Sequence, residues 1–267
     1  MDLGLDGATA VVAGGSRGMG RAVAEVLAAE GAKVAVMARG QNALDETVEA
    51  LRKIGHQDSV GLVADFTDAA SIADAFDQID RRWNALNILV HTVGPGSGTF
   101  ESLDDAAWDE AFTRGTMSAV RAVRAALPLL RRAGWARICT FGAVSVRRPN
   151  ARTIAYSATK SALASVTKNL AKSLAPEGIL VNCLCPGTIV TASFTESLRP
   201  VLAAENLDAS DPVSVMSWIG KTFHESAALG RAGLPGEVAS LAAYLVSRRN
   251  GYVTGATVNA DGGTDFF

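Results

Sequence analysis

The sequence has little of what several classes of protein require. It holds three cysteines, Cys139, Cys183 and Cys185, in 267 residues. That is too few for a disulfide framework, and because they fall in predicted strands we interpret them as buried thiols, not metal ligands. No window of about 18 apolar residues indicates a transmembrane helix, and the first residues lack the basic start and apolar run of a signal peptide. The net charge of −2 favours neither nucleic acid nor an anionic membrane as a partner. We therefore expect a reduced, cytoplasmic protein without a metal.

The sequence also lacks any sign of a boundary between domains. No stretch rich in serine and proline, no block of like charges and no internal repeat divides the chain. Hydrophobic residues make up 48% of it, enough for a core between three layers. We therefore expect one domain over residues 1–267.

Apolar strands and helices alternate along the whole chain. The strands are predicted at 8–13, 33–38, 59–64, 86–91, 136–141, 180–184 and 257–260, and the helices at 21–30, 42–54, 68–83, 103–132, 156–175 and 237–247. The strands are continuous apolar runs, which indicates that both of their faces are covered. The pattern predicts an α/β protein with a doubly wound parallel sheet, a Rossmann fold, whose ligands bind at the carboxyl ends of the strands.

A glycine-rich loop joins the first predicted strand to the first helix. Such a loop lets the backbone approach a pyrophosphate, and the helix behind it offers N–H groups and the positive end of its dipole. A glycine turn without a ligand is the alternative, but the place at the start of a βαβ unit favours a dinucleotide site. The residues that we expect to bind the dinucleotide here are Gly14, Ser16, Arg17, Gly18, Met19 and Gly20.

The end of the second strand predicts which dinucleotide binds. An acidic residue there would bind the ribose 2′-hydroxyl of NAD, but this chain has Ala38 followed by Arg39, with Arg17 in the glycine loop. A guanidinium matches a phosphate in charge and in its planar fork of donors. The two arginines therefore favour NADP over NAD, although solvation at the surface would explain either one alone.

Tyr156 and Lys160 stand four residues apart in a predicted helix. Side chains with this spacing lie on one face of a helix, one turn apart. The ammonium should lower the pKa of the phenol from about 10, and a phenol tuned in this way can exchange a proton with a carbonyl or an alcohol oxygen. A pair with a purely structural role is the alternative.

With these motifs in place, the chain resembles the short-chain dehydrogenase/reductase family, and within it the 3-oxoacyl reductases. The matching segments are Gly14–Gly20, Asp65–Asp68, Gly94, Tyr156 with Lys160, Asn182, Pro186–Thr191 and Gly251–Gly263. The resemblance implies that Tyr156 carries the proton and that Lys160 also binds the nicotinamide ribose. It places Asp65 and Phe66 at the adenine. It also implies further cofactor contacts from Gly94, Pro186, Gly187, Thr188, Ile189 and Thr191.

The resemblance implies two further features. Residues 192–231 would form a helical lid over the substrate, and the apolar Phe194, Met216, Trp218 and Phe223 in it favour a hydrophobic carbonyl or alcohol. The family commonly forms tetramers through the helix of Tyr156 and the chain end, here Phe266-Phe267. We therefore expect a homotetramer, or at least a dimer.

The chain departs from the family at three positions. Ala143 stands where the family has a catalytic serine, and we take Ser145, two residues on, as its candidate replacement, with an ordinary loop serine as the alternative. Gly115 stands where the family often has asparagine, and we expect it to leave room for a bridging water. His91 begins the segment that in the family reads Asn-Asn-Ala-Gly, and we interpret it as a buried, satisfied histidine near the adenosine.

Two functions remain open at this point. The first is an NADPH-dependent carbonyl reductase, or the reverse alcohol dehydrogenase, that uses Tyr156, Lys160 and Ser145. The second, suggested by Ala143 and Gly115, is a sensor or scaffold protein that binds NADP with little turnover.

Overall fold

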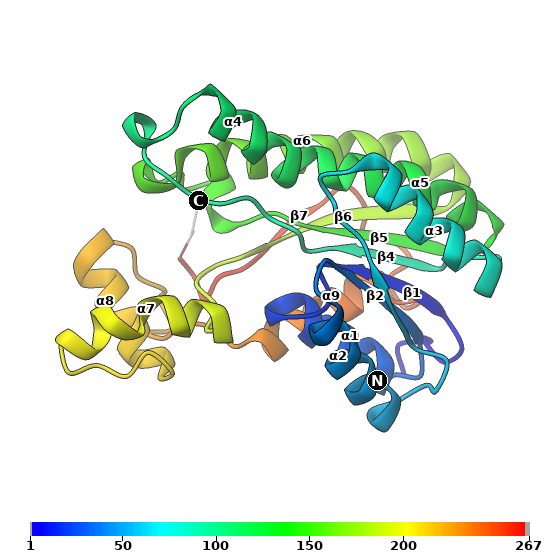
Figure 1. Cartoon of the computed structure of the whole chain (residues 1–267), viewed down its shortest axis with the longest axis horizontal. Helices are drawn as coiled ribbons and strands as arrows, with labels where there is room; N and C mark the ends of the chain where they lie inside the picture. The colour runs from blue at the N-terminus through cyan, green and yellow to red at the C-terminus, as the bar shows by residue number, and fades with distance from the viewer. Residues whose placement is uncertain (1, 265–267) are drawn as a thin grey trace.

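The computed structural model describes residues 2–264, which are built around one seven-stranded sheet (Figure 1). Every strand pairing is parallel, and the strand order is β3-β2-β1-β4-β5-β6-β7. The strands are β1 (Thr9–Ala13), β2 (Lys33–Ala38), β3 (Val60–Val63), β4 (Ile88–His91), β5 (Ala136–Phe141), β6 (Ile179–Pro186) and β7 (Thr257–Ala260). The order reverses between β1 and β4, and an open α/β sheet binds its ligands at such a point.

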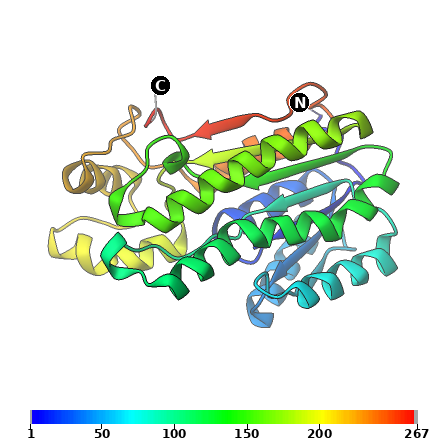
Figure 2. The same ribbon diagram turned by 90° about the horizontal axis from the view of Figure 1, so that it is seen from above.

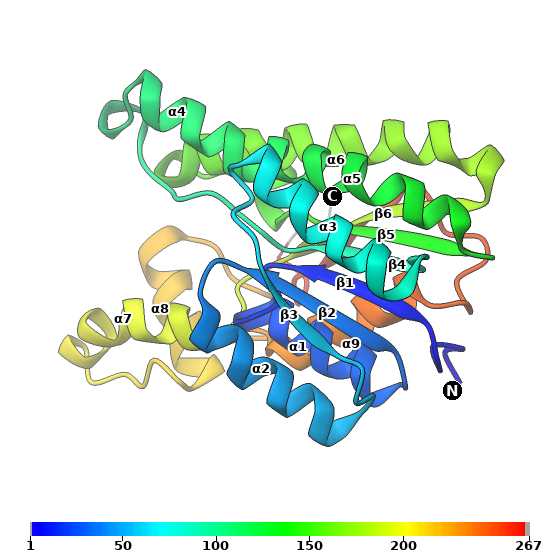
Figure 3. The ribbon, with the colours of Figure 1, turned by 45° about the vertical axis from the view of Figure 1, so that its right-hand side comes forward.

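Helices cover both faces of the sheet, as Figures 1 and 3 show. One face carries α1 (Gly18–Ala29), α2 (Gln41–Ile54) and α9 (Pro235–Val246). The other carries α3 (Ala69–Trp83), α4 (Asp105–Phe112), α5 (Ser118–Arg132) and α6 (Ile154–Leu174). The remaining turns are the short helices η1 (Phe100–Ser102), η3 (Val144–Val146), η4 (Ala151–Thr153) and η5 (Ala175–Glu177), and the π-helical turn η2 (Thr113–Met117).

Two apolar layers hold the helices to the sheet. Val12 and Val36 pack beneath α1, α2 and α9, whereas their neighbours Val11 and Met37 pack beneath α3 and α5. Successive side chains of a strand point to opposite faces, so a sheet buried on both faces needs apolar residues at every position. This confirms the fold expected from the continuous apolar strands.

The expected boundaries hold to within a few residues, with one correction. The single helix expected over 103–132 is instead α4 and α5, separated by the π-helical turn of η2. Pro128 lies inside α5, near its end, where a missing N–H and the ring are less disruptive than mid-helix.

Residues 192–231 form two helices beyond the carboxyl ends of the strands. They are α7 (Ala192–Ala204) and α8 (Pro212–Phe223), which stand together at one end of the molecule (Figures 1 and 2). They share an apolar cluster of their own that includes Leu202, Val215 and Trp218. The side chain of Asp211 accepts hydrogen bonds from the N–H groups of Val213 and Ser214 and so caps α8. The segment is therefore an ordered helical pair, and its role as a lid stays a prediction.

None of the helices in the described part of the chain combines the length and apolar character needed to cross a membrane.

Candidate active site

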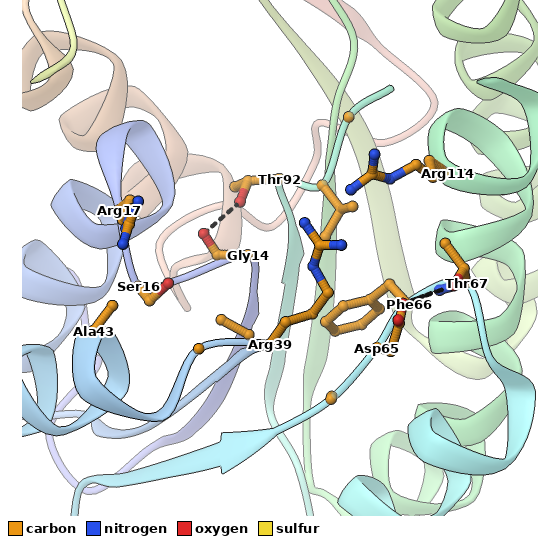
Figure 4. A pocket seen from close by; sticks show the side chains of 15 residues that line it. Gly14, Ser16, Arg17, Arg39, Ala43, Asp65, Phe66, Thr67, Thr92 and Arg114 are labelled. Atoms are coloured by element: carbon orange, nitrogen blue, oxygen red, sulfur yellow. Dashed lines mark hydrogen bonds between the residues drawn. The ribbon is translucent and has the colours of Figure 1, made fainter. Parts of the chain in front are cut away.

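Two of the cavities along the carboxyl edge of the sheet hold the predicted site residues. The first has a volume of about 620 Å³ and lies at the ends of β1, β2, β3 and β4 (Figure 4). Its lining residues are Gly14, Ser16, Arg17, Ala38, Arg39, Gly40, Ala43, Ala64, Asp65, Phe66, Thr67, Thr92, Val93, Gly94 and Arg114. Most of the residues expected to bind the adenosine half of a dinucleotide therefore meet in one place.

The glycine loop brings its backbone close to this cavity. Gly14 has a φ of +80°, which favours glycine, and a Cβ on Gly20 would come 2.2 Å from the Gly14 carbonyl oxygen. The hydroxyl of Thr92 donates to the carbonyl of Ala13 at 2.8 Å and ties the loop to β4. In the described part of the chain no side chain caps the start of α1, so its first N–H groups point at the loop and suit an anion.

Three guanidinium groups surround the first cavity. Arg39 and Arg114 extend toward each other across it, and Arg17 lies on the side of the glycine loop (Figure 4). Within residues 2–264, neither Arg17 nor Arg39 forms an ion pair, whereas Arg114 contacts Glu110 at 3.2 Å. Sequence reasoning missed Arg114, because only the turn of η2 directs its side chain into the cavity.

Asp65 and Phe66 line the same cavity after β3. The N–H and the hydroxyl of Thr67 donate to Asp65 Oδ1 at 2.9 and 2.7 Å. These hydrogen bonds lower the pKa of Asp65, and the charges of Arg39 and Arg114 lower it further. The carboxylate is thus fixed in its ionised form at the place where the resemblance puts the adenine.

The second cavity, of about 450 Å³, lies between the start of α6 and the pair α7 and α8. It is lined by Met19, Ser97, Gly142, Ala143, Val144, Ser145, Arg148, Asn150, Arg152, Thr153, Tyr156, Pro186, Gly187, Thr188, Ile189, Thr191, Phe194, Ile219, Phe223 and Glu225. It holds both Tyr156 and Ser145, and the five residues from 186 to 191 that were expected at the nicotinamide. The predicted catalytic and nicotinamide residues therefore share one space.

Three glycines of the predicted cofactor site make close contacts within the protein. Gly94 also lines the first cavity, whereas Gly18 and Gly20 line neither of the two cavities. Gly20 packs on Gly14, and Gly18 faces Thr191. A Cβ on Gly94 would lie 3.6 Å from Lys160 Nζ. Gly94 therefore stands where the first cavity approaches the catalytic pair.

Tyr156 and Lys160 are neighbours as predicted, but the pKa of Tyr156 differs from the predicted one. Lys160 Nζ lies 5.7 Å from the centre of the Tyr156 ring and donates to the carbonyl of Phe141 at 2.6 Å. Burial raises the pKa of Tyr156 to about 12 and lowers that of Lys160 to about 8. The expected lowering of the Tyr156 pKa was wrong, because loss of hydration disfavours the charged form of both groups.

Ser145 lines the second cavity with a buried side chain that is 8% exposed. Its hydroxyl makes no hydrogen bond to any residue between 2 and 264, so it does not bond directly to Tyr156. Ala143 lines the same cavity and supplies no hydroxyl. Ser145 is thus a buried hydroxyl in the lining of the cavity that also holds Tyr156.

Gly115 does not leave the expected room for water. A Cβ there would come 2.5 Å from Thr159 Oγ1 and 3.1 Å from Pro95 Cγ, so the Thr159 side chain already fills the space. The next residue, Thr116, donates its hydroxyl to the carbonyl of Thr159 at 3.0 Å. This turn therefore supports α6 through Thr116 and not through an asparagine.

His91 is buried, as expected, but it is not satisfied. Neither ring nitrogen has a hydrogen-bond partner among residues 2–264. The Phe66 ring meets it edge-on at 5.8 Å. Burial, with the nearby charge of Lys160, lowers the pKa of His91 to about 3, so the ring is neutral at neutral pH.

The second cavity is more polar than the lid sequence predicted. Apolar Val144, Phe194 and Ile219 line it, but so do two arginines and a glutamate, Arg148, Arg152 and Glu225. Sequence reasoning missed these charged residues because they lie in loops on either side of the cavity, and no motif contains them.

Comparisons with known proteins fit this geometry. The family described as enoyl-(acyl carrier protein) reductase matches residues 13–265. The 3-oxoacyl-[acyl-carrier-protein] reductase of Salmonella typhimurium is 32% identical over 262 residues, 98% of each chain. The chain belongs to the short-chain dehydrogenase/reductase family. It is an oxidoreductase of that family.

Two further relatives are similar over nearly their whole length. The short-chain reductase protein NovJ of Streptomyces niveus is 34% identical over 255 residues, 95% of this chain and 92% of NovJ. The structure of L-sorbose reductase from Gluconobacter frateurii, in complex with NADPH and L-sorbose, has a TM-score of 0.92 and 26% identity and covers 100% of both chains.

Proposed function

We propose that this protein is an NADP(H)-dependent carbonyl reductase that uses Tyr156 as its general acid. The observation that carries the proposal is the meeting of Tyr156 and the buried Lys160 beside a cavity for the substrate. The first cavity, with its three arginines, lies next to it along the same edge of the sheet. Its relatives in the family include reductases solved with NADPH.

The residues of the first cavity fit NADP(H). The uncapped start of α1 and the close glycine loop suit a pyrophosphate. Ala38 leaves the end of β2 without a carboxylate, while Arg17 and Arg39 offer positive charge for a 2′-phosphate. The cofactor of this chain is therefore NADP(H). When bound, it supplies or accepts the hydride.

Tyr156 is suited to give a proton to the substrate. With its pKa raised to about 12, the phenol is protonated at neutral pH, which is the form that a reduction consumes. Lys160 lies against the phenol ring, and its charge stabilises the phenolate that remains after the proton is given. Tyr156 is therefore in the protonated form that a reduction needs.

In this proposal Ser145 replaces the catalytic serine that the family has at the position of Ala143. Ser145 lines the same cavity as Tyr156, and its buried hydroxyl has no partner within residues 2–264. A donor placed in this way can hydrogen-bond the carbonyl oxygen and stabilise the charge that develops on it. The substrate is a small carbonyl compound, and the apolar part of the cavity suits a hydrophobic portion of it.

A sensor or scaffold protein that binds NADP with little turnover is the second candidate. Ala143 and Gly115 favour it, because they stand where the family has a catalytic serine and often an asparagine. A cytoplasmic location is predicted for either function.

Turnover separates the two candidates. We expect the wild-type protein to oxidise NADPH when it is supplied with a panel of ketones, and Tyr156→Phe to lose nearly all of this activity. NADPH affinity, measured by fluorescence titration, should be the same in both. NADPH binding with no turnover of any carbonyl would support the sensor and contradict the reductase.

A further inference from the structure

Arg152 occupies a particular place in the second cavity. It lies in η4, four residues before Tyr156. Its guanidinium stands over the ring of Phe223, the last residue of α8, at 4.9 Å from the ring centre. This contact holds a cation between the turn that leads into α6 and the lid.

No acidic side chain neutralises this cation. Among residues 2–264, Arg152 forms no ion pair with a carboxylate. Glu225 lines the same cavity, but its carboxylate accepts a hydrogen bond from Asn150 Nδ2 at 3.0 Å. The other arginine of the cavity, Arg148, donates to the carbonyl of Thr264. Arg152 is thus the arginine of this cavity whose guanidinium meets no protein acceptor within residues 2–264, and its exposed side chain leaves the donors open to a ligand.

A guanidinium in this setting favours an anion. Its contact with the face of an aromatic ring helps to position the group, and a guanidinium edge carries two parallel N–H donors that can bind a carboxylate or a phosphate through two oxygens. Part of the cavity wall is apolar, with Val144, Phe194 and Ile219. Arg152 itself is exposed to solvent, so its attraction for an anion depends on the geometry of the paired N–H donors more than on exclusion of water.

We propose that the substrate carries an anionic group, a carboxylate or a phosphate, and that Arg152 binds this group while Tyr156 serves the carbonyl oxygen. The inference rests on the proposed reductase function and names the class of its substrate. The substrate is then amphipathic, with an apolar portion against the lid and an acidic group at Arg152.

Matched compounds test this assignment. The wild-type protein is assayed with NADPH and a series of phenyl ketones, namely benzoylformate, 4-oxo-4-phenylbutanoate and 5-oxo-5-phenylpentanoate, with their methyl esters. The corresponding phosphonates separate recognition of a carboxylate from recognition of a phosphate. We expect kcat/KM for at least one acid or phosphonate to exceed that of its neutral ester about 10- to 100-fold.

Variants of Arg152 give the decisive comparison. In Arg152→Gln the ratio of kcat/KM for the acid to kcat/KM for its neutral ester should fall at least about tenfold. This ratio is the quantity compared, since Arg152 lines the substrate cavity and its loss can also affect the ester. Arg152→Lys keeps the charge without the planar fork and should retain part of the preference. Arg81→Gln, on the exposed surface of α3, is the matched control and should behave as the wild type.

A binding measurement makes the inference independent of turnover. Titration calorimetry of the NADP⁺-bound protein with the same acids should show tighter binding to the wild type than to Arg152→Gln. Equal preference for acids and esters, or a preference that Arg152→Gln retains, would overturn the assignment of Arg152 and leave the reductase intact. Acid binding that depends on Arg152 without any turnover would instead overturn the reductase.

Discussion

Ser145 is a buried hydroxyl without a protein partner. Leaving such a group unpaired costs about 1–3 kcal/mol, and a substrate oxygen in the same cavity would remove this cost. Buried polar groups of an active site can stay without a hydrogen-bond partner until the ligand binds. A variant of Ser145 therefore tests whether this serine has a structural or a catalytic role.

We predict that Ser145→Ala lowers kcat/KM for a carbonyl substrate about ten- to a thousand-fold, because one donor to the developing oxyanion is lost. NADPH affinity should not change, since Ser145 lines only the cavity of the substrate. The thermal midpoint should stay the same or rise, because the variant buries no unpaired hydroxyl. Steady-state kinetics, fluorescence titration and thermal unfolding measure the three effects.

The control for this prediction is Ser193→Ala. Ser193 is an exposed serine at the start of α7 that does not line the cavity, and its removal should leave kcat/KM unchanged. Wild-type turnover in Ser145→Ala would show that another group positions the substrate oxygen.

His91 links burial to stability in acid. Its pKa is about 3 in the folded protein and about 6.5 in an unfolded chain. Between these values only the unfolded state binds the proton, so the free energy of unfolding falls as pH falls below 6.5. At pH 5 the expected loss is about 2 kcal/mol.

We predict that His91→Leu, which cannot bind this proton, has a thermal midpoint that falls less steeply than that of the wild type between pH 7 and pH 5. His224→Asn is the control, because His224 is exposed and its left-handed backbone suits asparagine. Parallel curves for wild type and His91→Leu would contradict the low pKa.

Sequence reasoning at this scale succeeded where a residue type and its spacing carry the chemistry. The spacing of Tyr156 and Lys160 predicted their proximity, because it depends only on the helix that carries them. It did not predict the raised pKa of Tyr156, because burial depends on elements far away in the sequence. The same reason explains why Arg152 was missed: the ring of Phe223 that fixes it comes from the lid.

The π-helical turn η2 is the element that the sequence did not reveal. Within residues 113–117, Gly115 is the residue with the lowest helix propensity. A single glycine is tolerated in a helix at a modest cost, so the sequence predicted a continuous helix. The turn directs Arg114 into the first cavity and places Thr116 against α6. Extra-residue turns of this kind occur often at functional sites.

Gly115 should tolerate no side chain in this turn. A Cβ there would lie 2.6 Å from the Cβ of Thr159, a rigid part of α6. We predict that Gly115→Ala lowers the free energy of unfolding by about 1–3 kcal/mol through this overlap. Urea unfolding measures it.

Gly134→Ala is the matched control, since a Cβ at Gly134 would meet nothing within 4 Å. It should change stability by no more than about 0.5 kcal/mol. A Gly115→Ala protein as stable as this control would show that α6 moves aside at no cost.

At the scale of the whole molecule, the sequence predicted the sheet because its information is local and repeated. Each strand is a continuous apolar run and each crossover is a helix, so a parallel sheet with two covered faces is the consistent solution. The positions of α7 and α8 carried no such repeat. Their helical character was expected, but the charged side chains that they and the facing loops present to the cavity were not.

Assembly is the remaining prediction. The helix α6 carries exposed small residues, Ser161 and Ser165, on its outer face, and small side chains let a second helix approach closely. Phe266 and Phe267, the other part of the expected interface, lie outside the described residues. We predict that the protein is a homotetramer, or at least a dimer, in light scattering at micromolar concentration.

Ser165→Arg should shift it toward smaller species, because a long charged side chain would be forced into the contact between helices. Gln78→Arg, on the exposed surface of α3, introduces the same side chain away from α6 and should leave the mass unchanged. A wild-type monomer would refute the prediction, and a Ser165→Arg protein with the wild-type mass would place the interface on another face.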